Sequence, residues 1–212
     1  MKFTDFIKYI PKIQQQVLPA AAAHVKMAPA ERVFLDAEYY KAKNPRESAV
    51  MMLFYPKDGI AHLVLIKRNT YPGIHSSQIS FPGGKAEPED NNLEDTALRE
   101  TFEEVGVSPE DINVVMPFTK VYIPPSNFLV SPFLGIAESE LLFNPNPDEV
   151  AGIIELPLAV FLDDSIVIST PMSTSYAENI MVPAFRFRDH LVWGATAMIL
   201  SELKETIKSA FK

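Results

Sequence analysis

The stretch that decides the fold is Arg99-Glu100-Thr101-Phe102-Glu103-Glu104-Val105-Gly106-Val107. Wound as a helix at about 100° per residue, it places its three glutamates on one side. Leu98, Phe102 and Val105 then cluster on the opposite side, which we expect to face the core. Three carboxylates on one side of a helix repel one another, and a divalent cation such as Mg²⁺ or Mn²⁺ would relieve that repulsion. The alternative interpretation is a solvated acidic face.

The residues on either side of this stretch favour a binding site. A Pro82-Gly83-Gly84 turn lies upstream, where glycine lets the backbone approach an ion or a phosphate closely. Arg99 adjoins the acids and can hold one of them in place as a fixed donor. The helix itself is expected over 93–105, with Asn91 or Asn92 as N-cap and Gly106 as its end.

Short apolar runs and turns around this helix predict a mixed α/β sandwich. A β-hairpin is expected from 48–55 and 60–67, and a second one from 166–170 with 184–187. Further strands are expected at 112–117, 120–123, 128–137 and 149–156. Helical periodicity appears in 3–17, 158–162 and 194–210.

Composition narrows the function classes. The chain has 212 residues, 47% of them apolar and 22% charged, with a net charge of −8 and no cysteine. We therefore expect one domain over 1–212, with a helical extension in 1–30 and a core in 48–203. The acidic balance disfavours nucleic-acid binding, and the lack of cysteine excludes disulfides and thiolate chemistry. No apolar run has the length of a signal peptide or a membrane span, so a cytoplasmic protein is expected.

The motif resembles the box of the Nudix hydrolase family, whose downstream half reads Arg-Glu-x-x-Glu-Glu-x-Gly followed by an apolar residue. The sequence matches at Arg99, Glu100, Glu103, Glu104, Gly106 and Val107. Thr101 stands at a place that is usually apolar, and the box is one residue longer than usual. Asn91 stands where the family has a glutamate, so Asp90 or Glu89 is expected to brace Arg99 instead.

The resemblance implies a Nudix-type α/β/α sandwich with a mixed sheet and a metal-dependent phosphoanhydride hydrolase. It implies that Glu100, Glu103 and Glu104 bind Mg²⁺ or Mn²⁺ together with the backbone carbonyl of Gly83. Glu103, Glu104 and Arg99 then belong to the catalytic machinery, in which water attacks a phosphorus atom. The family often forms dimers, so a homodimer is one option.

The run His75-Ser76-Ser77-Gln78-Ile79-Ser80-Phe81 before the box resembles the signature of the coenzyme A pyrophosphatase subfamily. Val182-Pro183 and Trp193-Gly194-Ala195-Thr196-Ala197 resemble it as well. The subfamily usually has arginine at the place of Gly73 and glycine at that of Ser77. A positive charge for the substrate phosphate would then come from another basic residue: Lys67, Arg68, Lys85 or Lys120.

The resemblance thus implies hydrolysis of coenzyme A or its derivatives to 3′,5′-ADP and (acyl-)4′-phosphopantetheine. The alternatives are a Nudix hydrolase acting on ADP-ribose or another nucleoside-diphosphate-linked substrate, and a Nudix-fold binding module without catalysis. The intact set of three glutamates argues against the last.

Other candidate residues keep two interpretations each. Glu149 is either the general base or a surface glutamate. His75 either contacts substrate or caps loop backbone groups. Ser126 and Asn127 either line the substrate pocket or form a plain turn.

Overall fold

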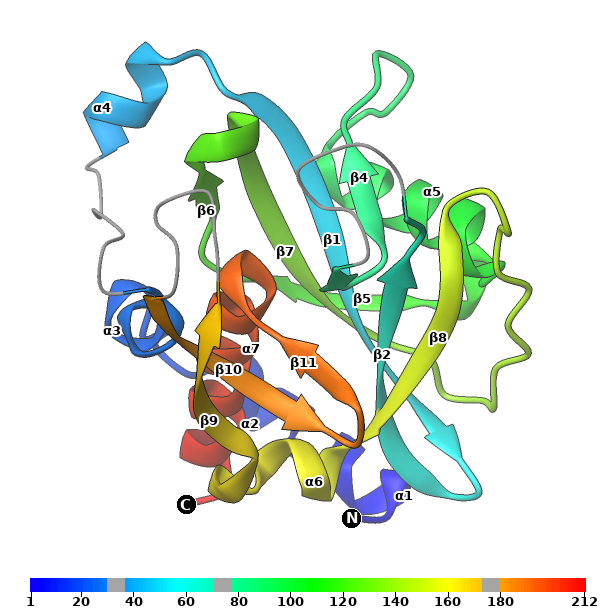
Figure 1. The fold of residues 1–212 in the computed structure, drawn as a ribbon. Helices are drawn as coiled ribbons and strands as arrows, with labels where there is room; N and C mark the ends of the chain where they lie inside the picture. The colour runs from blue at the N-terminus through cyan, green and yellow to red at the C-terminus, as the bar shows by residue number, and fades with distance from the viewer. Residues whose placement is uncertain (30–36, 71–77, 173–179) are drawn as a thin grey trace.

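Strand β1 (Arg46–Lys57) runs through the centre of the larger of two sheets, in a mixed α/β fold (Figure 1). This computed structural model describes residues 1–29, 37–70, 78–172 and 180–212. β1 pairs antiparallel with β2 (Ile60–Arg68) and parallel with β7 (Phe128–Ile136). Because both faces of β1 are covered, its sequence is a nearly continuous apolar run.

The other strands of this sheet extend from that centre. β3 lies beyond β2 and β5 beyond β7, while β4 pairs with β1, β6 with β7 and β8 with β2. Their bounds are Ile79–Ser80 (β3), Gly83–Lys85 (β4), Asn113–Pro117 (β5), Val121–Ile123 (β6) and Val150–Pro157 (β8). Short helical turns at Pro109–Asp111 (η3) and Pro124–Ser126 (η4) precede β5 and β7.

The smaller sheet is built by three strands in the order β11-β10-β9. Their bounds are Val167–Met172 (β9), Ile180–Phe187 (β10) and His190–Val192 (β11). Helix α6 (Leu158–Leu162) and the turn η5 (Asp164–Ile166) connect the larger sheet to this one.

Helices cover the large sheet on two sides and create two apolar clusters. Alternate residues of β1 enter different clusters: Phe54 lies in one and Leu53 in the other. The Phe54 cluster includes α7 (Gly194–Ala210) and the first helical segments, through fully buried Phe6 and Ile13. These segments are α1 (Phe3–Phe6), η1 (Ile7–Tyr9), α2 (Ile10–Gln14), α3 (Ala21–His24) and η2 (Val25–Met27). The Leu53 cluster includes α5 (Leu93–Val105), through fully buried Val105.

Most expected elements are confirmed. The helices at Leu93–Val105, Leu158–Leu162 and Gly194–Ala210 and both hairpins form as predicted, and the class is mixed α/β. The sequence did not predict α4 (Ala37–Ala42), β4 or β11. Gly83 and Gly84 predicted only a turn, yet they form a strand because pairing with Val50 and Ala49 of β1 outweighs their weak β propensity. Within the described residues, no helix is long and apolar enough to span a membrane.

The predicted orientation of α5 was wrong at Phe102, whose surface is 52% exposed. Thr101 is fully buried in its place, and its hydroxyl donates to the carbonyl of Ala97 at 2.6 Å. That bond satisfies the buried polar group, so threonine is tolerated where an apolar residue was expected. The same rotation turns Glu104 toward the sheet, where it is 1% exposed.

Truncating Phe102 therefore tests the orientation of α5. We expect Phe102→Ser to change the free energy of unfolding by less than about 0.5 kcal/mol, because the side chain already contacts water. Val105→Ala, one turn away on the buried side, is expected to cost about 1–3 kcal/mol through lost packing. Urea denaturation of both variants gives the comparison. A larger loss for Phe102→Ser than for Val105→Ala would contradict the observed rotation.

Candidate active site

The carboxylate of Glu104 lies at the base of the candidate site, between α5 and β4. Its Oε2 accepts a hydrogen bond from the backbone N–H of Gly83 at 2.8 Å. Its Oε1 accepts from Nη1 of Arg68, at the end of β2, at 3.3 Å. This position requires glycine for two reasons. Gly83 has a φ of +148°, and a side chain there would clash with the carbonyl of Ala49 on β1.

Glu100, one turn before Glu104, packs directly on Gly84. A Cβ at Gly84 would lie 2.3 Å from Oε2 of Glu100, so any larger residue there would displace this carboxylate. Glu103 is the most exposed of the three, with 49% of its side chain accessible. The carboxylates of Glu100 and Glu104 therefore lie directly against the backbone of Gly83 and Gly84.

Arg99 is fixed by Asp90, which resolves the alternative between Asp90 and Glu89. Arg99 Nε and Nη2 donate to the two oxygens of Asp90 at 2.9 and 3.0 Å, a bidentate pair. The hydroxyl of Thr96 and the backbone N–H of Glu87 also donate to Asp90, at 2.8 and 2.9 Å. Asn91, at the place of the usual glutamate, donates to Asp95 instead.

Arg99 in turn donates hydrogen bonds to two of the candidate metal ligands. Its Nη1 donates to Oε1 of Glu100 and to Oε2 of Glu103, both at 3.0 Å, and its Nη2 donates to the carbonyl of Lys85. Asp90, Arg99 and the glutamates of α5 therefore form one hydrogen-bonded network. The sequence left Asp90 and Glu89 as alternative partners of Arg99, and the fold selects Asp90.

Burial makes the carboxylates of Glu100 and Glu104 costly to ionise. Burial raises the pKa of Glu104 to about 7, against the opposing effect of the Gly83 N–H and Arg68. Burial also raises the pKa of Glu100, while its bond to Arg99 lowers it. The negative charge of Glu149 makes a smaller contribution to both upward shifts. Glu149 itself is exposed, and its carbonyl accepts from Asn69 N.

This donor set fits a hard divalent cation. Carboxylate oxygens beside an open backbone approach are the ligands that Mg²⁺ and Mn²⁺ prefer, and a cation would offset the mutual repulsion of Glu100, Glu104 and Glu149. In the described ranges no three His, Asp or Glu side chains already converge as metal ligands. Instead, Arg99 and Arg68 hold the carboxylates.

The remaining candidates lie in different places. Lys85 is exposed on β4, and its backbone carbonyl accepts from Arg99. Asn127 accepts from the hydroxyl of Tyr122 and donates to the carbonyl of Lys43, so its side chain stabilises the turn before β7. The carbonyl of Ser126 accepts from Arg46 in that same turn. These contacts fit the turn interpretation. His75, Gly73 and Ser77 fall outside the described residues.

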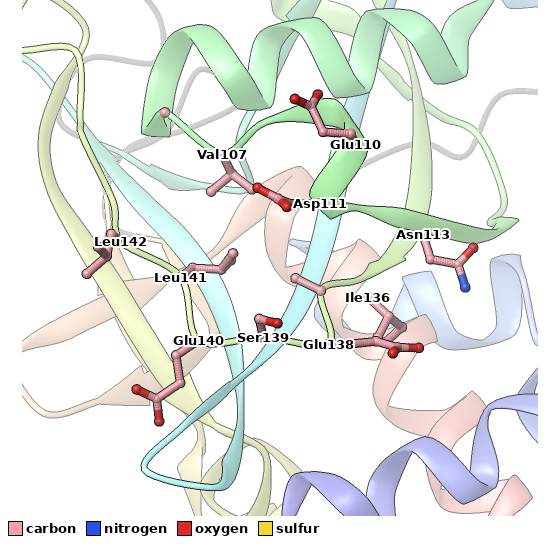
Figure 2. Close-up of a pocket in the computed structure, with 12 residues that line it drawn as sticks. Val107, Glu110, Asp111, Asn113, Ile136, Glu138, Ser139, Glu140, Leu141 and Leu142 are labelled. Atoms are coloured by element: carbon pink, nitrogen blue, oxygen red, sulfur yellow. The ribbon is translucent and has the colours of Figure 1, made fainter.

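A cavity of about 510 Å³ lies beyond the C-terminal end of α5 and does not include the carboxylates of the site. Figure 2 shows Glu110 and Asp111 on one side of it and Glu138, Ser139 and Glu140 on the other. Glu140 accepts a hydrogen bond from the backbone N–H of Asp58, in the turn between β1 and β2. The cavity is therefore separate from the candidate site.

The fold and this network define a mixed α/β protein with a carboxylate site carried by one helix. A model of the NUDIX domain matches residues 45–168, so the chain belongs to the NUDIX domain family.

Relatives in this family cover most of the chain. Nudix hydrolase 15, mitochondrial, of Arabidopsis thaliana is 34% identical over 174 residues, which are 78% of this chain and 59% of that protein. Nudix hydrolase 22, chloroplastic, of the same plant is 35% identical over 163 residues, 74% of this chain and 53% of that protein. The chain thus spans little more than half the length of these two relatives. Uncharacterized Nudix hydrolase NudL of Photorhabdus laumondii is 32% identical, across 78% of this chain and 87% of that protein.

Solved structures share the fold. A Nudix hydrolase from M. smegmatis, RenU, has a TM-score of 0.53 at 16% identity, over 78% of this chain and 87% of that one. A MutT/nudix family protein from Enterococcus faecalis has a TM-score of 0.53 at 20% identity, over 84% of this chain and 71% of that one.

The pair between Asp90 and Arg99 predicts a pH-dependent contribution to stability. Arg99 holds the pKa of Asp90 well below its ordinary 3.8, so the pair stabilises the fold fully above pH 3.8 and less as the pH falls further. We expect Asp90→Asn to cost about 1–3 kcal/mol at pH 7. The difference in the free energy of unfolding between this variant and the unchanged chain should be smaller at pH 3.

Urea denaturation at pH 7, 5 and 3 measures this difference, with Glu89→Gln as the control in the same loop. Glu89 is exposed, so its variant should stay close to the unchanged chain at every pH. A cost of Asp90→Asn that is as large at pH 3 as at pH 7 would show that Asp90 does not act through its charge.

Proposed function

We propose that this chain hydrolyses the phosphoanhydride bond of a nucleoside-diphosphate-linked small molecule, with coenzyme A or its derivatives as the favoured substrate. The observation that carries the proposal is the position of the α5 carboxylates on the Gly83–Gly84 backbone, with Glu104 buried and Glu100 packed on Gly84. Membership of the NUDIX domain family supports hydrolysis as the type of reaction.

In this proposal Glu100, Glu103, Glu104 and the carbonyl of Gly83 hold Mg²⁺ or Mn²⁺. When bound, the cation neutralises phosphate charge and lowers the pKa of water in the site. The protein contributes a rigid donor set, because Arg99 is fixed at once by Asp90 and by the carbonyl of Lys85. Fixed ligands need little reorganisation during the reaction, which favours the transition state.

The reaction itself is a displacement at phosphorus. The oxygen of a water molecule bonds to phosphorus, the bridging P–O bond breaks, and the bridging oxygen leaves with its own phosphate. We propose Glu149 as the group that takes the proton from water, because it is exposed to solvent and its charge is felt by Glu100 and Glu104. We propose that Arg68, whose guanidinium contacts Glu104, and the exposed Lys85 meet the charge of the substrate.

The substrate proposal rests on the sequence signature before the box. For coenzyme A the products are 3′,5′-ADP and 4′-phosphopantetheine. His75 is proposed to contact the substrate. Ser126 and Asn127 are proposed to line its pocket from the turn that their hydrogen bonds hold. A single domain over 1–212, a homodimer and a cytoplasmic location stay predictions.

Parallel hydrolysis assays test this function. Coenzyme A, ADP-ribose and NADH are incubated with the protein and Mg²⁺, and the products are resolved by mass. We expect the highest kcat/KM for coenzyme A, with release of 3′,5′-ADP, and no turnover when a chelator removes the metal. A higher kcat/KM for ADP-ribose would refute the coenzyme A assignment and leave the hydrolase assignment standing.

Glu104→Gln separates an enzyme from a binding module. We expect it to lower kcat/KM by about a hundredfold or more, since it removes a ligand charge at the base of the site. Glu94→Gln is the matched control, because Glu94 is exposed on the first turn of the same helix and should retain activity. Full hydrolysis by Glu104→Gln would show that the metal site is elsewhere.

A further inference from the structure

Two arginines neutralise the carboxylates of α5, but they are held very differently. Arg99 donates to Asp90, Glu100, Glu103 and the carbonyl of Lys85, all within 3.0 Å. Arg68 is joined to Glu104 by one hydrogen bond of 3.3 Å. Arg99 is therefore a fixed part of the site, whereas little holds Arg68 to its carboxylate.

The position of Arg68 adds to this difference. It is the last residue of β2, where the pairing with β8 shifts register between Lys67 and Arg68. Its Nε is buried and has no hydrogen-bond partner in the described part of the chain, although 26% of the side chain is exposed. A buried N–H without an acceptor is unfavourable, so the observed position of Arg68 leaves part of its bonding capacity unused.

Glu104 explains why Arg68 stays there. The carboxylate is almost fully buried and faces the charges of Glu100 and Glu149, so it needs a positive partner. Oε2 is satisfied by the N–H of Gly83, which leaves Oε1 for a cation. Arg68 occupies that oxygen in the described structure.

We propose that Arg68 is a displaceable counter-cation, which neutralises Glu104 in the metal-free protein and gives up Oε1 when a divalent cation binds. Its guanidinium, with an unused Nε, then becomes available to the phosphate oxygens of the substrate. This inference rests on the proposed metal site at Glu104. It adds that the metal binds first and so releases Arg68 to bind the substrate phosphate.

A counter-cation and a structural brace predict opposite changes in metal affinity when Arg68 is removed. If Arg68 competes with the cation for Glu104, removing its charge makes divalent cations bind more tightly. If Arg68 instead braces Glu104 in the position that a metal needs, removing it makes them bind more weakly. The metal affinity of an Arg68 variant therefore distinguishes the two roles without any measurement of activity.

The first experiment is a titration of the metal-free protein with Mn²⁺, followed by the electron paramagnetic resonance signal of free Mn²⁺. We expect Arg68→Gln to lower the Kd for Mn²⁺ by about tenfold, the equivalent of one charged hydrogen bond. Arg186→Gln is the matched control, because it removes the same charge from an exposed position on β10. It should leave the Kd within about twofold of the unchanged chain.

Each outcome has one meaning. An unchanged or higher Kd in Arg68→Gln, with Mn²⁺ bound normally by the unchanged chain, overturns the counter-cation and leaves the proposed hydrolase intact. Absence of Mn²⁺ binding by the unchanged chain overturns both. Circular dichroism checks that the variant is folded, and Arg68→Met, which also removes the charge, replaces it if it is not, with an expected Kd that is also lower than that of the unchanged chain.

A second experiment uses the unchanged chain. The arginine Nε–H signals are followed by NMR during a Mg²⁺ titration, and that of Arg68 is identified by its loss in Arg68→Gln or Arg68→Met. We expect the Arg68 signal to move further than that of Arg99, and to move again when ADP is added as a phosphate probe. An Arg68 signal that does not respond to Mg²⁺ overturns the proposal.

Discussion

The cost of burying the carboxylate of Glu104 shapes the structure around it. A carboxylate that is 1% exposed is strongly destabilising unless donors replace its water. The N–H of Gly83 is one such donor, and it reaches Glu104 only because β4 is paired with β1 and bends closely under α5. Gly83 in β4 and Arg68 at the end of β2 supply donors to this carboxylate, and the rotation of α5 turns it toward them.

A second network keeps the exposed end of the site in place. The extra residue between Gly84 and Arg99 would shift a brace that depended on sequence spacing alone. Asp90 replaces the missing glutamate because the loop before α5 folds back, with Thr96 and the N–H of Glu87 holding its carboxylate toward Arg99. The geometry of the brace is thus preserved although its residue and its position have changed.

Helix periodicity and end signals predicted where the elements lie, but not which residues of each element are buried. The sequence marked the ends of α5 at Asn91 or Asn92 and at Gly106, and Asn92 is the N-cap, because an N-cap acceptor and a left-handed glycine act locally. The rotation of the helix could not be predicted, since Phe102 looks like a core residue and Thr101 does not until the bond to Ala97 is seen. The choice of Asp90 over Glu89, and the contact of Arg68 with Glu104, depend on tertiary structure. For Ser126 and Asn127, the sequence contained no signal that distinguished a turn from a substrate pocket.

The claim on which the account depends is that the carboxylates of α5 gather around a divalent cation on the Gly83–Gly84 backbone. Crystals soaked in Mn²⁺ test it most directly through the anomalous scattering of manganese. The account predicts an anomalous peak in contact with Glu100, Glu104 and the carbonyl of Gly83, with Arg68 no longer bonded to Glu104. A peak elsewhere, or none while both arginines keep their carboxylates at saturating Mn²⁺, would contradict it.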